Sequence, residues 1–99
     1  MERTIGAFIN KSWDGYFDHY SIPGYMREGL RNYIENHQPP GHFLRAILEN
    51  DLREACIRAD DTNRHLLWNY VNFLYNEAPV ACWGSPQIVK EWLQQKDSK

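Results

Sequence analysis

Apolar residues recur every three or four positions along most of the chain, which is the spacing of one face of a helix. The first such stretch follows Pro23, and proline suits the first turn of a helix because its missing N–H has no partner there. It stops before Pro39, since a proline disfavours the α conformation in the residue preceding it. We therefore expect a helix from about residue 23 to residue 37, with an apolar face made by Met26, Leu30, Tyr33 and Ile34.

The next stretch, residues 42–60, is helical by propensity, but it contains a charged residue at an apolar position. One unbroken helix would place Asp51 inside the apolar stripe, and burying an unpaired carboxylate is costly. Either the helix breaks, with Asn50 as N-cap and Asp51 in the first turn of a new helix, where negative charge is favoured. Or Asp51 is buried and paired with an arginine. The pattern favours the break.

Two more helices follow from their start signals. One begins near Asp60, with Asp60, Asp61 or Thr62 as its cap, and runs to about Ala78 before Pro79. The last begins at Ser85, where an N-cap serine is followed by a proline at the first helical position. Their expected core residues are Leu66, Leu67, Tyr70, Val71, Phe73 and Leu74 in the first, and Ile88, Val89, Trp92 and Leu93 in the second.

Residues 1–22 are rich in aromatic side chains and lack a clear helical period. Asp14-Gly15 lies among them and would turn a hairpin or punctuate an irregular arm, and a helix is also left open. We expect these aromatics to pack onto the helices or onto another copy of the chain. The sequence thus predicts an all-α, single-domain bundle of four to five helices over residues 23–95, with an aromatic N-terminal arm over residues 1–22 and a tail over residues 96–99.

Composition narrows the class of protein. The chain of 99 residues is the size of one domain, and its formal net charge of −2 gives no basis for non-specific nucleic-acid binding. No apolar run approaches the ~18 residues of a membrane span, and the start does not follow the signal-peptide pattern. The 2 cysteines make neither a disulfide framework nor a zinc pattern. We expect a soluble cytoplasmic protein without cofactors or membrane contacts.

Trp83 lies in the short connector before the last helix, among Pro79, Gly84 and Pro86. Those three residues turn the chain sharply. The tryptophan is then expected either to plug the end of the bundle or to stand out as a platform. A buried indole N–H would still need an acceptor.

Six short motifs, in one order, resemble a family of small proteins encoded by bacteriophages and prophages. The motifs are I-P-x-x-M-R-x-x-L, P-P-G-x-F-L, N-D-L, R-A-D-x-x-N, Y-N-x-A-P and W-G-S-P, over residues 22–30, 39–44, 50–52, 58–63, 75–79 and 83–86. They extend over about three quarters of the chain and leave out the aromatic arm. The resemblance implies a role against host machinery or host defence, in the host cytoplasm.

A second aromatic stripe marks the helix that begins near Asp60. Arg64, Trp68 and Tyr75 project at nearly one angle, opposite the core arc. Three interpretations are open: a central helix packed on both sides, a subunit interface, or the wall of a ligand site. Arg27 and Arg31, one turn apart on an earlier helix, would either clamp a phosphate or pair with nearby glutamates.

Polar residues gather where helices are expected to begin and end. A pair between Arg58 and either Asp51 or Asp60 would fix these junctions; alternatively, the helix ends converge on a polar pocket. His37, at a helix C-terminus, is expected to be a cap or a packed histidine. The residues of this predicted polar junction are Asn50, Asp51, Arg58, Asp60, Asn63 and Asn76.

Catalysis has little support in the sequence. It contains no nucleophile motif and no glycine-rich phosphate loop, and the 4 histidines lack metal-ligand spacing. The first hypothesis is therefore a homo-oligomeric binding protein that sequesters a small anionic, nucleotide-like host immune signal. The alternatives are an interaction module that inhibits a host protein, or a virion or assembly accessory protein. Aromatic stacking and arginine–phosphate contacts predict a ligand site made by Arg27, Arg31, Arg64, Trp68, Tyr75 and Trp83.

Overall fold

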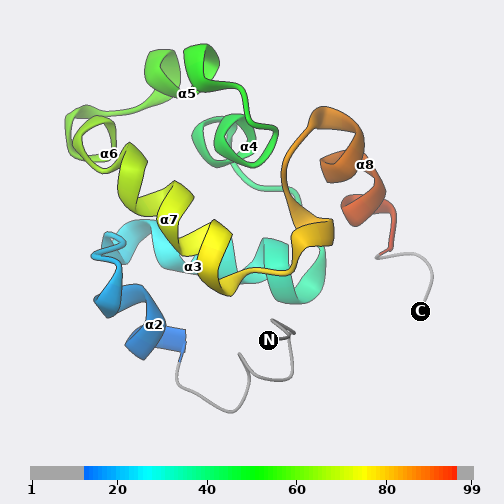
Figure 1. Cartoon of the computed structure of the whole chain (residues 1–99), viewed down its shortest axis with the longest axis horizontal. Helices are drawn as coiled ribbons and strands as arrows, with labels where there is room; N and C mark the ends of the chain where they lie inside the picture. Colours follow the sequence, from blue (N-terminus) through cyan, green and yellow to red (C-terminus); the bar gives the residue numbers. More distant parts are fainter. Residues whose placement is uncertain (1–12, 96–99) are drawn as a thin grey trace.

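The computed structural model describes residues 13–95, and within them the chain is an all-α single domain, as predicted (Figure 1). The first 12 residues of the arm and the tail at 96–99 lie outside the described part. No described helix is long and apolar enough to cross a bilayer. The elements are α2 (Trp13–His19), α3 (Gly24–Asn36), α4 (His42–Leu48), α5 (Leu52–Arg58), α6 (Asp61–His65), α7 (Leu67–Glu77), the 3-10 helix η1 (Val80–Cys82) and α8 (Pro86–Gln94).

The predicted break between α4 and α5 is confirmed, but its cap is one residue later than expected. Asn50 has a left-handed backbone with φ of 63° and ends α4. Asp51, which is exposed, is itself the N-cap, and its Oδ1 accepts a hydrogen bond of 3.1 Å from the Glu54 N–H. Asp51 therefore does not lie in the apolar stripe. As an exposed cap, its carboxylate contacts water and accepts a hydrogen bond from a free helix N–H.

The helix expected over residues 60–78 is two helices. Asp60 is the N-cap, as one of the predicted alternatives, and its Oδ1 accepts from the Asn63 N–H at 2.7 Å. At Leu66 the backbone tightens, because its N–H bonds the Asn63 carbonyl three residues back instead of the fourth. This second break and the presence of α2 give seven α-helices in the described chain, where four to five were predicted.

Trp13, Tyr16 and Phe17 lie in the helix α2, so the hairpin and irregular-arm alternatives are wrong for residues 13–19. Phe17 is 1% exposed, and its ring centroid lies 5.3 Å from that of Phe73 in α7. Tyr20 meets the same ring edge-on at 5.7 Å. These residues pack onto the helices of their own chain, which was one of the two predicted alternatives. They share one core with α3, α4, α7 and α8.

The connector after α7 is held to the core by backbone groups. The Tyr33 hydroxyl donates to the Cys82 carbonyl at 2.7 Å, and the Gly84 N–H donates to the Leu48 carbonyl at 2.7 Å. Trp83 is half-buried against the core, between the plug and the platform that the sequence allowed. The Ser85 side chain caps α8, as predicted.

His37 both caps and packs. Its backbone, with φ of 57°, ends α3 in the left-handed conformation, and its N–H bonds the Tyr33 carbonyl. Its Nδ1 lies 2.8 Å from the Trp92 carbonyl, and because a carbonyl only accepts, Nδ1 carries the proton. The Trp92 indole in turn donates to the Tyr33 carbonyl at 2.8 Å, which ties α8 to α3.

Candidate interaction surface

Helix α7 has two unlike faces. Tyr70, Phe73 and Leu74 are at most 1% exposed and point into the core. At 100° per residue the opposite arc is occupied by Trp68, Val71, Asn72 and Tyr75, and these four residues are named the α7 face. The local sequence therefore produces a helix that is apolar on both sides, and tertiary packing decides which side is covered.

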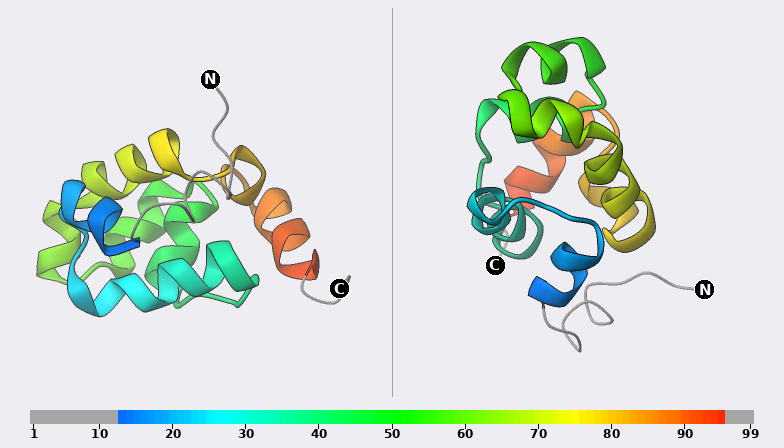
Figure 2. Two further views of the ribbon diagram at one scale, coloured as in Figure 1. Left: turned by 90° about the horizontal axis from the view of Figure 1, so that it is seen from below. Right: turned by 90° about the vertical axis from the view of Figure 1, so that its left-hand side faces the viewer.

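The α7 face points away from the molecule. Trp68 is 72% exposed and Tyr75 65%. Val71, which was expected in the core, is 39% exposed, so that prediction is wrong. Figure 2 (left) shows α7 along one edge of the molecule and α3 along the opposite edge. Within residues 13–95 the interpretation of this helix as central and packed on both sides is therefore wrong, because the α7 face is exposed.

A shallow apolar groove borders the α7 face on the side of α5. It has a volume of about 50 Å³. Its rim carries Leu52, which is 69% exposed at the start of α5. Leu52 thus extends the apolar surface beyond α7 itself. The groove is lined by Ile47, Asn50, Asp51, Leu52, Ala55, Leu67 and Val71.

Arg27 lies in a different groove, of about 830 Å³, between α2 and α3. Its Nε donates to the Ile22 carbonyl at 2.8 Å, and its guanidinium pairs with Asp18 at 2.8 Å and Asp14 at 3.4 Å. The guanidinium carbon also lies 5.7 Å from the centre of the Phe17 ring. Arg27 therefore fastens α2 to α3, a role that occupies the donors which a phosphate would need.

Arg31 lines the same groove and pairs with Glu35 at 3.0 Å, as the alternative to a phosphate clamp predicted. Its guanidinium carbon lies 5.6 Å from the centre of the Trp13 ring. Carboxylates outnumber the two arginines, because Asp14, Glu28 and Glu35 all line the groove. This balance disfavours an anionic ligand.

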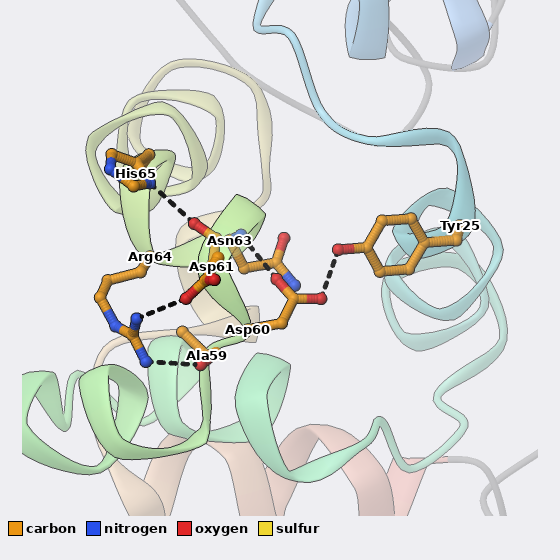
Figure 3. Close-up of polar contacts among 7 residues, drawn as sticks. All are labelled: Tyr25, Ala59, Asp60, Asp61, Asn63, Arg64 and His65. Carbon is orange, nitrogen blue, oxygen red and sulfur yellow. Dashed lines mark hydrogen bonds and ion pairs between the residues drawn. The ribbon is translucent and has the colours of Figure 1, made fainter.

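Arg64 belongs to α6 and is held locally. Its guanidinium pairs with Asp61 at 2.9 Å and donates to the Ala59 carbonyl at 3.1 Å (Figure 3). The side chain is 51% exposed. His65 on the same helix has its Nδ1 2.8 Å from the Asp61 carbonyl. All of these contacts join residues within α6 or directly before it.

The polar junction forms around Asp60 and Asn63, with two tyrosines that the sequence analysis missed. The exposed Tyr25 hydroxyl donates to the Asp60 Oδ2 at 2.5 Å (Figure 3), and the Tyr70 hydroxyl donates to the Asn63 Oδ1 at 2.5 Å. Asn63 is 3% exposed. No local signal marks the pair of Tyr25 and Asp60, since 35 residues separate them.

The pKa values at the junction follow from these hydrogen bonds. The bond from Tyr25, helped by the bond from the Asn63 N–H, lowers the pKa of Asp60, and the same bond to Asp60 raises the pKa of Tyr25. Burial raises the pKa of Tyr70. The Tyr25 and Tyr70 hydroxyls are thus held as neutral donors and the Asp60 carboxylate as an acceptor. These hydrogen bonds stabilise the junction.

The other residues predicted at the junction lie elsewhere. Asn50 and Asp51 form the α4–α5 turn, and Asn76 donates to the Asn72 carbonyl and side chain one turn back on α7. Arg58 pairs with Glu54 at 2.6 Å within α5, instead of with Asp51 or Asp60. No shared polar pocket brings the six residues together, because their partners are mostly within their own helices.

The six residues predicted to bind a ligand likewise fall into separate places. Arg27 and Arg31 line the α2–α3 groove, Arg64 lies on α6, Trp68 and Tyr75 are on the α7 face, and Trp83 follows η1. Within residues 13–95 no three His, Cys, Asp or Glu side chains converge as metal ligands. Comparisons with protein-family models, curated proteins and solved structures find no match. The resemblance to phage-encoded proteins therefore stays a prediction.

Proposed function

We propose that the protein is a non-enzymatic interaction module whose α7 face binds a partner protein. The observation that carries this proposal is the exposure of Trp68 and Tyr75, at 72% and 65%, on one side of a helix whose other side is core. Tryptophan and tyrosine are enriched among the residues that contribute most to interface binding energy. Contiguous apolar patches on a protein surface are often binding sites.

The shape of the surface suits a macromolecule better than a small ligand. The groove beside the α7 face is about 50 Å³, whereas small-molecule sites usually enclose ~300–1,000 Å³. The α7 sequence carries one charged residue, Glu77, and that carboxylate accepts from Tyr20 at 2.7 Å. A complementary surface would therefore be apolar and uncharged, with hydrogen-bonding groups for the α7 asparagines.

Under the predicted resemblance to phage-encoded proteins, the partner is a host protein that the module inhibits. Sequestration of a nucleotide-like signal has less support from the geometry. The arginines that would meet the phosphates are engaged with carboxylates and backbone carbonyls, and Arg27 and Arg31 lie in a groove that the aromatic residues of the α7 face do not line.

Site-specific photocrosslinking tests the proposal. A benzophenone amino acid at position 68 should capture a defined protein in host cells, whereas the same probe at the exposed Gln87 on α8 should not. The captured protein is then purified and titrated calorimetrically. Trp68→Ala should weaken binding at least tenfold, which corresponds to ~1.4 kcal/mol. Equal capture at both positions, or unchanged binding by Trp68→Ala, would contradict the proposal.

Stability measurements supply the matched control. Trp68→Ala should change the free energy of unfolding by no more than ~0.5 kcal/mol, because the side chain is exposed. Leu74→Ala, on the buried side of the same helix, should lower it by ~2–5 kcal/mol through a core cavity. A calorimetric titration with linear and cyclic nucleotides is run beside the protein titration. Nucleotide binding that Trp68→Ala abolishes would replace the proposed function with the sequestration hypothesis.

A further inference from the structure

The groove beside the α7 face combines apolar walls with one charged side chain. Its walls are aliphatic side chains of α4, α5 and α7, whereas Asn50 and Asp51 of the α4–α5 turn are the polar residues that line it. Val71 belongs to both the groove and the α7 face. A partner that covers Trp68 and Tyr75 therefore meets the groove as part of the same surface.

The carboxylate of Asp51 has no counter-charge within residues 13–95. Asp51 is exposed and belongs to none of the ion pairs formed by these residues. The two acidic residues nearest to it in the sequence are both paired. Glu49 binds Arg45 at 2.9 Å, and Glu54 binds Arg58 at 2.6 Å. The groove is thus bordered by one negative charge that a binding partner can neutralise.

We propose that the partner protein inserts a lysine side chain into this groove and places its ammonium group on Asp51. The inference rests on the proposed function and adds a specificity determinant to the α7 face. A volume of about 50 Å³ has room for one unbranched side chain, since a cavity needs ~10–15 Å³ to hold a single water. Lysine suits both parts of the groove, because its aliphatic stem covers apolar surface while its charged end stays in water.

The cap at α5 favours lysine over arginine. Arginine binds a carboxylate best through two parallel hydrogen bonds that use both oxygens. Oδ1 of Asp51 already accepts from the Glu54 N–H, which leaves Oδ2 for the partner. An ammonium group needs only one carboxylate oxygen, and its other donors can reach the amide oxygen of Asn50 or water. The surface of α7 itself therefore suits an uncharged partner surface, and the groove adds one positive charge beside it.

Selection from a library of helical peptides displayed on yeast tests the inference, with the intact protein as target. Peptides that bind the natural chain but not Trp68→Ala are ligands of the α7 face, and we expect them to share a lysine at one position. Asp51→Asn is the matched variant. Asparagine caps a helix about as well as aspartate, so the melting temperature should be unchanged although the charge is removed. Selection on Asp51→Asn should no longer enrich that lysine.

Calorimetric titration of a selected peptide then separates the charge of the lysine from its stem. Methionine in place of the lysine keeps an apolar stem, and it should weaken binding to the natural chain about three- to fivefold. The same replacement should change binding to Asp51→Asn by less than about twofold. Alanine should weaken binding to both proteins further, because it leaves the groove empty. Arginine should bind no more tightly than lysine.

Two results would overturn the inference. One is a set of α7-face peptides without a shared lysine, and the other is a lysine whose replacement by methionine weakens binding equally to both proteins. Failure here is distinguishable from failure of the proposed function. If peptides depend on Trp68 but not on Asp51, the α7 face is an interaction surface and the groove does not select lysine. If no peptide depends on Trp68, the proposed function and this inference both fail.

Discussion

Asn63 is the residue on which the α6–α7 junction depends. Its side chain is 3% exposed and its Oδ1 accepts from the buried Tyr70 hydroxyl, while its backbone N–H is capped by Asp60. The local pattern predicted a cap at Asp60, Asp61 or Thr62. The apolar period correctly marked Tyr70 as a core residue, but it gives no information about where the Tyr70 hydroxyl finds an acceptor.

Asn63→Ala should lower the free energy of unfolding by ~1–3 kcal/mol, because the buried Tyr70 hydroxyl loses its acceptor. In a double-mutant cycle with Tyr70→Phe, the double variant should be less destabilised than the sum of the single ones. Urea denaturation followed by circular dichroism measures this. Arg64→Ala, which removes an exposed ion pair, serves as control and should cost ~0–1 kcal/mol. Strict additivity of Asn63→Ala and Tyr70→Phe would contradict the coupling.

Among the elements, the turn between α4 and α5 shows how a charged residue changes the course of a helix. Asp51 would lie in the apolar stripe of an unbroken helix, and the structure avoids this by placing Asn50 in the left-handed region and Asp51 at the cap. Asparagine tolerates that conformation better than most residues. The break was predictable from the stripe, but the residue that caps α5 depends on backbone angles that the pattern does not specify.

The effect of substitutions at this turn on stability should depend on the left-handed backbone of Asn50 and on the cap at Asp51. Asn50→Gly should leave the free energy of unfolding unchanged or raise it, since glycine adopts positive φ freely, whereas Asn50→Val should lower it by ~1–2 kcal/mol. Asp51→Ala should cost ~0.5–2 kcal/mol through the lost cap. Thermal and urea denaturation are the measurements, with the exposed Arg53→Ala as control. A valine variant as stable as the natural protein would show that the turn relaxes.

Over the whole molecule, two tyrosine hydroxyls join segments far apart in the sequence, and a third joins the consecutive helices α6 and α7. Tyr20 donates to Glu77 across α2 and α7, Tyr33 donates to the Cys82 carbonyl, and Tyr70 donates to Asn63. Burial and the Glu77 hydrogen bond raise the pKa of Tyr20 to about 12, and burial raises the pKa values of Tyr33 and Tyr70 as well. The neutral hydroxyls are therefore part of what stabilises the fold.

This predicts a loss of stability in alkali. Because the folded chain retains protons that the unfolded chain releases near the ordinary tyrosine pKa of about 10, the contribution is complete below that pH and is lost as pH rises through about 12. Thermal melts from about pH 9 to 12 should show a falling melting temperature, with a shallower decline in Tyr20→Phe. Equal slopes for the two proteins would contradict the role of Tyr20.

The sequence by itself determined where most helices begin and end and most of the residues that form the core, with Val71 as an exception. Pro23, Asp60, Pro79 and Ser85 act through local backbone geometry and capping, and the apolar period reports the buried face of each helix. Only the tertiary structure decided the structure of residues 13–22, where Trp13–His19 form a helix because α3 and α7 provide a surface for its aromatic side chains.

The candidate site was decided by tertiary structure in the same way. Arg64, Trp68 and Tyr75 were recognisable as a second stripe, but its exposure depends on which elements surround α7, and no local pattern encodes that arrangement. The bond between Tyr25 and Asp60 also joins residues far apart in the chain, and Arg27 pairs with Asp14 and Asp18 of the preceding helix. The sequence pattern determines on which side of a helix a residue lies. Tertiary packing determines whether that side contacts another helix or solvent.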